Sequence, residues 1–260
     1  MSELLGHFSA SQAAGFICVL ARISPLFLLA PMFSSRSFPT RARAIAALAL
    51  TIGFAPLAMR GQEVPVGAAE LAGLIAKEIL VGMAFAFAIA ATFAAVQVAG
   101  AMLDTFTGFA FAALVDPLTG QQSAIMTRVY TIVGLAIFVA IGGDQWVIQG
   151  LARTYEEVPL LETPGIGELV GGVNGAFAGI FLGGVEVAAP IIIALLLTDV
   201  AFGLVSRVVP QLNVFAVGFP AKITVGLLIV GVSLPFAAGW LEDELQASVR
   251  SALDTIGVVG

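Results

Sequence analysis

A long run without a charged side chain constrains this sequence more than any other feature. It extends from Ile79 to Leu103 and is dominated by apolar residues. A helix rises about 1.5 Å per residue, so this run is long enough to cross the hydrocarbon core of a bilayer with some tilt. Of all residues 59% are hydrophobic and only 11% are charged, whereas about a quarter are charged in soluble domains. The sequence therefore predicts an integral membrane protein.

The remaining apolar segments predict an all-α, membrane-embedded helical protein. The 260 residues leave room for about six spans of about 20 residues each, and for little else. The hydrophobic helical segments that we expect are Leu4 to Met32, Ala42 to Met59, Glu70 to Leu103, Val129 to Val147, Gly171 to Arg207 and Ile223 to Trp240. The positive-inside rule places the arginine-rich loop between the first two segments in the cytoplasm.

Several function classes are disfavoured by composition. The net charge of -6 and the scattered lysines and arginines provide no basic surface for a nucleic acid. The one cysteine, Cys18, excludes an internal disulfide and a thiolate metal cluster, and His7 is the one histidine. We find no motif of a hydrolase, a zinc protease or a phosphate-binding loop. We therefore expect no enzymatic activity, no cofactor and no metal site.

Two stretches interrupt the apolar pattern, and the first lies between Asp199 and Lys222. Pro210 and Pro220 disfavour continuous helix there. Gln211 and Asn213 carry polar side chains that hydrocarbon cannot satisfy. The pattern predicts a helical hairpin with a polar tip, bracketed by Arg207 and Lys222, near one face of the membrane.

The second interrupted stretch runs from Asp104 to Arg128. Gly108, the Asp116-Pro117 pair and Gly120 break it too often for a full crossing. Irregular backbone cannot face lipid at membrane depth, which favours a re-entrant or lumen-filling loop. An amphipathic connection on the membrane surface remains an equal alternative.

Acidic side chains within or beside the spans are candidates for function. Glu78, Asp104, Glu186 and Asp199 could form a proton or ion pathway, or they could pair between helices. We favour pairing because most charges lie near the ends of predicted spans. Lys77 and Glu78 are adjacent and point in different directions on a helix, so we do not expect them simply to neutralise each other. Small residues at every fourth position predict a helix-packing face, formed by Gly171, Gly175, Gly179 and Gly183.

Three segments resemble the FliR family, the flagellar members of a type III export-gate family that virulence injectisomes share. They are LARISPLFLLAPMFSSRSFPTRARAIAALAL (20 to 50), EILVGMAFAFAIAATFAAVQVAGAMLDTFTGFAFAALVDPLTG (78 to 120) and APIIIALLLTDVAFGLVSRVVPQLNVFAVGFPAKITVGLLIVGVSLP (189 to 235). The resemblance covers nearly the whole chain, and SRVVPQLNVFAVGFPAK is its most specific part.

The resemblance implies a subunit of the flagellar export gate in the bacterial inner membrane, at the basal body. The implied partners are FliP-like and FliQ-like gate subunits and FlhB-like and FlhA-like export proteins, with unfolded exported proteins as substrate and lipid around the gate. Residues 1–174 would form a FliP-like portion with the plug loop at 104–128. Residues 175–260 would form a FliQ-like hairpin with its tip at 207–222 and an acidic tail.

The resemblance also implies roles for particular residues. The loop from Gly108 to Gly120 would plug the closed channel, and the tip of the hairpin would contact a partner. The implied plug residues are Gly108, Phe109, Phe111, Leu114, Val115, Asp116, Pro117 and Gly120. The implied tip residues are Arg207, Pro210, Gln211, Asn213, Phe215, Pro220 and Lys222.

Two other functions are compatible with the composition. An ion-coupled small-molecule transporter would use the buried acids and would predict an inverted internal repeat. Residues 1–130 and 131–260 show no convincing match of that kind. A passive membrane scaffold would have neither interrupted stretch facing a lumen.

Overall fold

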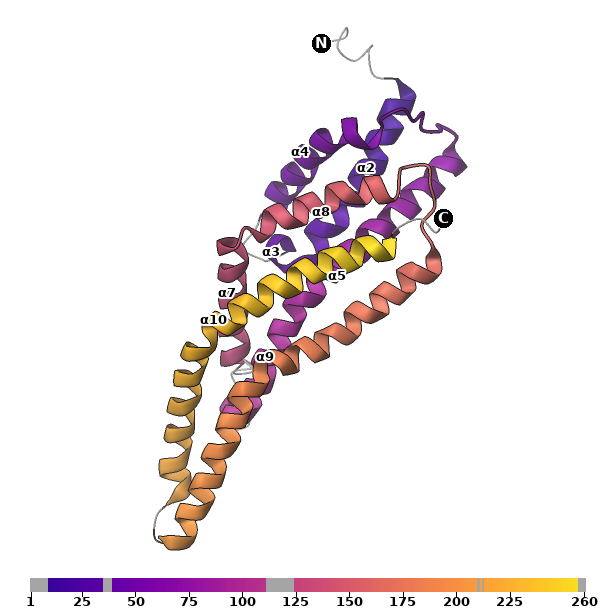
Figure 1. Ribbon diagram of the computed structural model, residues 1–260. Helices are drawn as coiled ribbons and strands as arrows, with labels where there is room; N and C mark the ends of the chain where they lie inside the picture. The colour runs from indigo at the N-terminus through magenta and orange to yellow at the C-terminus, as the bar shows by residue number, and fades with distance from the viewer. Residues whose placement is uncertain (1–8, 35–38, 111–123, 210, 212, 257–260) are drawn as a thin grey trace. The chain divides into compact units, whose positions relative to one another are not determined.

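The helices account for all regular structure in the part of the chain that the computed structural model describes, which is residues 9–34, 39–110, 124–209, 211 and 213–256. The all-α prediction is thereby confirmed (Figure 1). The main helices are α2 (Ala10–Leu29), α3 (Pro31–Ser34), α4 (Thr40–Ala58), α5 (Ala68–Thr107), α7 (Ile125–Ala140), α8 (Gly143–Glu157), α9 (Ile166–Val208) and α10 (Val214–Ile256).

Five of these helices are long and apolar enough to cross a membrane, and a bent pair makes up to six. This agrees with the prediction of about six hydrophobic segments. The bent pair is α7 and α8, where the sequence predicted one span from Val129 to Val147. The helix breaks because Gly142 adopts a φ of 70°, a left-handed conformation that glycine reaches readily.

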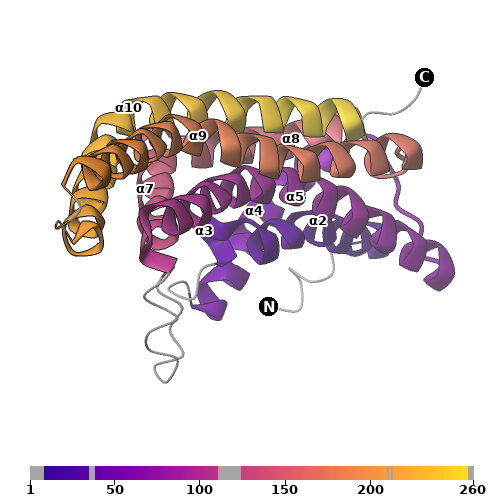
Figure 2. The same ribbon diagram turned by 90° about the horizontal axis from the view of Figure 1, so that it is seen from below.

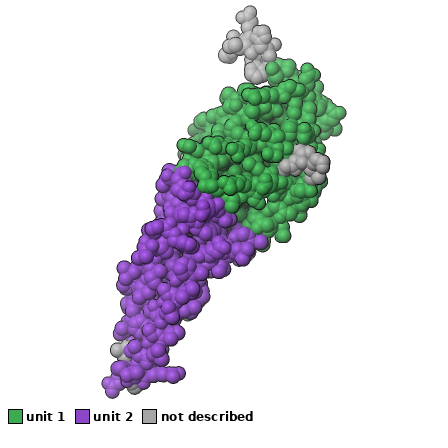
Figure 3. Space-filling model, in the orientation of Figure 1, with its two compact units in different colours: residues 1–91, 142–177, 245–260 green, residues 92–141, 178–244 purple. Residues whose placement is uncertain are grey.

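The helices divide into two compact units (Figure 3). Unit 1 contains Met1–Ala91, Gly142–Phe177 and Leu245–Gly260, and unit 2 contains Thr92–Ile141 and Ala178–Glu244. Helices α5, α9 and α10 each contribute residues to both units. The predicted division at residue 175 concerns a resemblance to two other subunits and stays a prediction.

Unit 1 is built around α2, which packs against α4. A capping box begins α2: the Gln12 amide donates to Ser9 Oγ at 3.1 Å, and the Ser9 amide donates to Gln12 Oε1 at 3.0 Å. These bonds satisfy amides that the first turn of a helix leaves free. The last part of α10 adds a buried apolar face at Leu245, Val249, Leu253 and Ile256.

That part of α10 differs from the prediction. The sequence predicted a span ending at Trp240 and a separate acidic tail from Glu242 to Gly260. The helix instead continues to Ile256. Neither glycine nor proline occurs between Trp240 and Ile256, and the apolar residues recur at helical spacing, so the acidic residues occupy the other face of the same helix.

Unit 2 contains the second half of α5, α7 and a hairpin formed by α9 and α10. Figures 1 and 2 show these two helices side by side; α9 ends at Val208 and α10 begins at Val214. Leu103, Met126, Ile191 and Leu195 are among the buried residues of its core.

The hairpin connection is shorter than predicted. The sequence predicted interrupted backbone from Asp199 to Lys222, but α9 continues to Val208 and α10 begins at Val214. Asn213 helps to begin α10, because its Oδ1 accepts a hydrogen bond from the Ala216 amide at 3.2 Å. Pro220 therefore lies inside α10. Membrane helices tolerate such a proline when neighbouring groups satisfy the freed carbonyl.

Candidate functional site

The start of α7 is capped by a side chain from another helix. The residue in the N-cap position, Ala124, makes no side-chain hydrogen bond, because alanine has no acceptor. Asp104 of α5 supplies the acceptors instead. Its Oδ1 accepts from the Met126 amide at 2.7 Å, and its Oδ2 accepts from the Thr127 amide at 3.0 Å and from Thr127 Oγ1 at 2.8 Å. These amides belong to the positions that a local cap ordinarily satisfies.

Gly100 brings the two helices close enough for this contact. It lies one turn before Asp104 on α5, so the two residues share a face. A Cβ atom at Gly100 would lie 2.5 Å from Thr127 Cα and 2.9 Å from Thr127 N. A larger residue would therefore push the α7 backbone away. We call Gly100, Asp104, Met126 and Thr127 the α5–α7 clamp.

The clamp has physical consequences for α7. Asp104 is 5% exposed, and its carboxylate lies at the positive end of the α7 dipole. Such an interaction contributes about 0.3–1 kcal/mol at exposed sites and up to about 2 kcal/mol in partly buried ones. The pairing interpretation of Asp104 is supported, because both of its oxygens accept from fixed donors of α7.

Gly108 lies one turn beyond the clamp, at the end of α5. Its φ of 93° is a conformation that residues with a Cβ rarely adopt. A Cβ here would lie 2.8 Å from Cε2 of Phe219, which comes from the hairpin helix α10. The phenyl ring therefore covers the glycine. Sequence reasoning missed Phe219 as a candidate because nothing near it in the sequence links it to Gly108.

Most of the predicted plug residues lie outside the described part of the chain. These are Phe111, Leu114, Val115, Asp116, Pro117 and Gly120. Phe109 is described, and it packs against the buried core of unit 2. The plug role itself stays a prediction.

The predicted tip residues lie at the end of the hairpin in unit 2. Arg207 is in the last turn of α9, and Gln211 and Asn213 are exposed in the connection. Lys222 donates to Asp199 Oδ2 at 2.7 Å, which ties the two helices together near the tip. Pro210 lies outside the described residues, and the backbone of Phe215 belongs to the first turn of α10.

The hairpin also exposes apolar surface close to the tip. Four valines and a leucine there are at least 42% exposed: Val200, Leu204, Val205, Val208 and Val209. Exposed apolar surface of this extent indicates contact with lipid or with another protein.

Glu78 lies in the most deeply buried charged cluster of unit 1. Arg22 and Glu78 have no exposed side-chain surface, and two guanidinium nitrogens donate to the carboxylate, Nη2 to Oε1 at 3.0 Å and Nε to Oε2. Arg22 Nη1 also donates to the Thr154 carbonyl at 2.7 Å, and its guanidinium carbon lies 4.3 Å from the centre of the Tyr155 ring. Pairing and hydrogen bonding together make such burial tolerable.

Lys77 corrects one expectation from the sequence. Its ammonium lies 2.8 Å from Glu78 Oε1, although adjacent helical residues point in different directions. The long side chain folds back, and the same nitrogen donates to the Leu160 carbonyl at 2.5 Å and to the Glu162 carbonyl at 2.8 Å. The loop after α8 therefore guides the ammonium toward Glu78.

Glu186 and Asp199 are exposed in the single chain, although the sequence predicted buried charges there. Helix α9 presents both side chains away from the core of unit 2. Glu186 Oε2 accepts from Trp240 Nε1 at 3.0 Å, and Asp199 pairs with Lys222. Each of the four acids thus has a hydrogen-bonding or ionic partner, which favours pairing over an ion pathway.

The predicted glycine face is only partly used within the chain. A Cβ at Gly183 would lie 2.6 Å from Trp240, whereas no atom of the described residues lies within 4 Å of one at Gly171, Gly175 or Gly179. The close approaches that the sequence missed include Gly184, where a Cβ would lie 2.6 Å from Val98. The unused positions remain predictions of helix packing.

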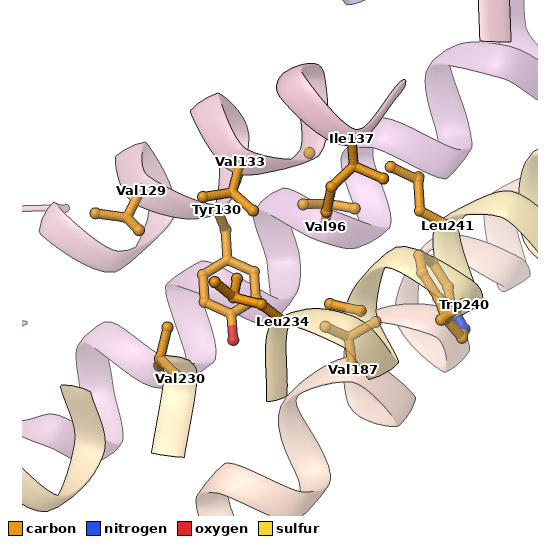
Figure 4. Close-up of a pocket in the computed structure, with 12 residues that line it drawn as sticks. Val96, Val129, Tyr130, Val133, Ile137, Val187, Val230, Leu234, Trp240 and Leu241 are labelled. Atoms are coloured by element: carbon orange, nitrogen blue, oxygen red, sulfur yellow. The ribbon is translucent and has the colours of Figure 1, made fainter. Parts of the chain in front are cut away.

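Unit 2 contains a small apolar cavity between α5, α7, α9 and α10. Figure 4 shows Tyr130, Val187, Leu234 and Trp240 around it. Its volume is about 20 Å³, far below the roughly 300 Å³ or more of a typical small-molecule pocket. This cavity is therefore too small to hold a small-molecule substrate.

Comparison with known proteins identifies the family. The family model described as "Bacterial export proteins, family 1" matches residues 13–248. The chain is 32% identical over 223 residues to the flagellar biosynthetic protein FliR of Escherichia coli (strain K12), covering 86% of this chain and 85% of the relative. It is 28% identical over 265 residues to FliR of Bacillus subtilis (strain 168), covering 100% and 99%.

A relative with a different name matches as well. The chain is 25% identical over 226 residues to the surface presentation of antigens protein SpaR of Salmonella typhimurium, covering 86% of this chain and 82% of the relative. The FliR and SpaR relatives therefore both match over most of their length. The chain belongs to bacterial export protein family 1, the FliR and SpaR family of type III export, as a non-enzymatic multispan protein of the bacterial inner membrane.

Proposed function

We propose that this chain is a subunit of the flagellar type III export gate. It forms, with FliP-like and FliQ-like subunits, the channel through which unfolded flagellar proteins leave the cytoplasm, and FlhB-like and FlhA-like proteins serve that channel. The support is the family match over residues 13–248 together with similarity over most or all of the chain to relatives named flagellar biosynthetic protein FliR.

The segment from Gly108 to Gly120 is the plug of the closed channel in this proposal. One structural observation supports it most: Asp104, near the end of α5, binds Met126 and Thr127 at the start of α7. The two helices on either side of the segment are thus held together at this point. Gly108, with its φ of 93°, provides a bend that an ordinary residue would resist.

The tip of the α9–α10 hairpin contacts an export partner in this proposal. Support comes from the exposed Arg207, Gln211 and Asn213 and from the exposed apolar residues on the same part of α9. An interface that combines apolar surface with a few polar groups is typical of specific protein association.

Two experiments test the proposed function. The tagged chain is co-expressed with the membrane proteins encoded beside it and is purified in mild detergent. The mass of the intact complex is then measured. FliP-like and FliQ-like subunits are expected to co-purify, and a stable solitary chain or homodimer under verified co-expression would contradict the gate assignment. In assembled gates, shortening the Gly108–Gly120 segment is expected to cause ion leak, and an equally tight gate would refute the plug.

A further inference from the structure

We infer that unit 1 contains a binding site for a phosphate group, in a polar cavity between α8 and the last part of α10. Two arginines line this cavity, Arg153 from α8 and Arg250 from α10, and its volume is about 200 Å³. We call it the two-arginine cavity. The phosphate belongs to an anionic phospholipid headgroup or is free in solution, and the test below separates these two sources. The inference goes beyond the proposed function and does not depend on it.

The spacing of polar side chains along two helices forms the walls of the cavity. Trp146, Gln149 and Arg153 follow one another at intervals of three and four residues, so they share one face of α8. Gln246 and Arg250 are one turn apart and share a face of α10. The two faces line the same cavity, which brings together residues about a hundred positions apart in the sequence.

Gly150 fixes the distance between these faces. It is buried, and a Cβ there would lie 2.7 Å from Val249 Cγ1 and 3.0 Å from Cζ of Phe85. The side chain of Val249 is itself buried, at 9% exposed. The close approach of α8 and α10 is therefore set by apolar packing around the glycine, and not by the arginines themselves.

The cavity carries positive charge without a matching carboxylate. Its other polar side chains are the neutral Gln149 and Gln246. Within the described part of the chain neither arginine forms an ion pair, and Arg250 Nη2 makes one long hydrogen bond, of 3.4 Å, to Gln246 Oε1. A guanidinium presents five N–H donors in a planar fork that matches the oxygens of a phosphate. Most of these donors are therefore left for a ligand.

Two acidic residues on the same helices do not neutralise the arginines. Glu157 lies four residues after Arg153, and Asp254 lies four residues after Arg250. A helical pair with the acid on the C-terminal side is weaker than the reverse order. Neither pair forms among the described residues, and both acids are exposed. The two positive charges therefore add at the cavity.

The size and the surroundings of the cavity define the ligand. Its volume of about 200 Å³ is below the roughly 300 Å³ of a typical small-molecule pocket, which suits a single phosphate ester. The amides of Gln149 and Gln246 can donate to further phosphate oxygens. Trp146 is half-buried in the wall, and indoles concentrate at the headgroup level of a membrane. Basic pockets between helices bind anionic headgroups there, so a phospholipid is the nearer source.

The test measures the binding of lipid and of phosphate to the purified protein. The tagged chain is purified in mild detergent with the membrane proteins co-expressed beside it. Native mass spectrometry follows titrations with short-chain phosphatidylglycerol and short-chain phosphatidylcholine, and calorimetry follows inorganic phosphate. Arg153→Gln, Arg250→Gln and the double variant are compared with the natural chain. The matched control is Arg41→Gln with Arg60→Gln, which removes the same charge from unit 1 at two exposed arginines that do not line the cavity.

The expected result is a preference for the anionic lipid that depends on both arginines. Phosphatidylglycerol should bind more tightly than phosphatidylcholine, whose choline group neutralises its phosphate. A basic residue near a lipid surface raises affinity about 5-fold, so each single variant should bind phosphatidylglycerol about 5-fold more weakly and the double variant about 25-fold more weakly. The control variant should bind as the natural chain does. The melting temperature of the double variant without added lipid should not fall, because two like charges have been removed from one cavity.

Inorganic phosphate identifies the source of the ligand. Arginine-dependent binding of inorganic phosphate without a preference for phosphatidylglycerol assigns the cavity to free phosphate. Arginine-dependent binding of phosphatidylglycerol assigns it to the lipid headgroup. In both cases the phosphate site stands.

Two outcomes overturn the inference. The first is binding of both lipids and of phosphate that is unchanged in the Arg153→Gln and Arg250→Gln variants. The second is an equal loss in the Arg41→Gln and Arg60→Gln control, which would show an effect of net charge alone. If the double variant cannot be purified, the single variants decide. Binding is measured equally well on a solitary chain, so failure of this inference and failure of the proposed export function are distinguishable.

Discussion

Helix α5 uses an acidic residue and a glycine one turn apart in each compact unit, and the two pairs hold their neighbours differently. In unit 1, Glu78 pairs with Arg22 and Lys77, and a Cβ at Gly82 would lie 2.1 Å from the Arg22 carbonyl oxygen. In unit 2, Asp104 binds backbone amides and a hydroxyl of α7, beside Gly100. The same spacing therefore places a carboxylate beside two cationic side chains in unit 1 and at the N-terminus of a helix in unit 2.

The difference lies in what remains after one partner is lost. In unit 1 a fully buried guanidinium would remain without a counter-charge, which is strongly destabilising. In unit 2 the amides of one helix end would remain, and loss of a cap is a smaller penalty. Loss of a partner should therefore cost more stability in unit 1 than in unit 2.

The largest expected effect is that of Glu78→Ala. We expect it to lower the free energy of unfolding by about 3–5 kcal/mol, against about 1–2 kcal/mol for Asp104→Ala. Thermal unfolding of purified complexes measures both. The double variant Arg22→Met with Glu78→Met should recover most of the loss, because no fully buried charge then remains and Lys77 keeps its hydrogen bonds to the Leu160 and Glu162 carbonyls. Equal losses for Glu78→Ala and Asp104→Ala would remove the distinction between the units.

The glycines are expected to rank next. Gly82→Ala and Gly100→Ala should each lower the stability of the complex by about 1–3 kcal/mol, because the new Cβ meets backbone atoms that cannot move freely. Gly73→Ala on the same helix is the control. In the described part of the chain nothing lies within 4 Å of a Cβ there, so the change should raise stability by up to about 1 kcal/mol. A lower melting temperature for Gly73→Ala than for Gly82→Ala and Gly100→Ala would contradict the close backbone contacts at Gly82 and Gly100.

A smaller effect is expected from single hydroxyl groups. Tyr155→Phe removes the hydrogen bond to the Val19 carbonyl, at 3.2 Å, but keeps the ring beside Arg22. Thr127→Val removes the hydroxyl that binds Asp104. Each should lower stability by about 0.5–1.5 kcal/mol, which the melting temperatures of the purified complexes measure. A loss well above this range in either variant would contradict the expected order of effects.

The smallest effect on stability is expected from Lys222→Met. Lys222 and Asp199 form an ion pair with partly exposed side chains, and such pairs contribute about 0–1 kcal/mol. The melting temperature should hardly change. Reduced export at unchanged stability would support contact between the hairpin tip and a partner, and Asp199→Asn distinguishes the loss of the pair from the loss of the lysine. A large drop in melting temperature would show that the pair is structural.

The helical class and most of the helices were predictable from the sequence. Apolar runs such as Ile79 to Leu103 are long enough to span a membrane and leave no alternative to helix for their backbone groups. The predicted helix boundaries were less accurate near proline and glycine. Pro220 lies within α10, whereas Gly142 divides a predicted span in two. Proline and glycine only bias the local backbone, and neighbouring contacts decide the outcome.

The candidate site shows the same limit. The sequence marked Asp104 and Gly108 as unusual, and composition alone required partners for buried acids. It gave no signal for Thr127 as the partner of Asp104, nor for Phe219 as the neighbour of Gly108. It also predicted that Lys77 and Glu78 would not neutralise each other, because the loop that directs the ammonium lies far away in the sequence.

The sequence by itself determined a membrane-embedded helical protein of the FliR and SpaR export family, because hydropathy and motif order are properties of the chain alone. Only the tertiary structure decided which acids pair with which groups, and that α7 begins on an aspartate from α5. Apart from Lys77 with Glu78, those contacts join residues 22 or more positions apart, and no local pattern specifies a partner at that separation. Packing of the helices brought these groups together, and it therefore decided the partners of the acidic side chains.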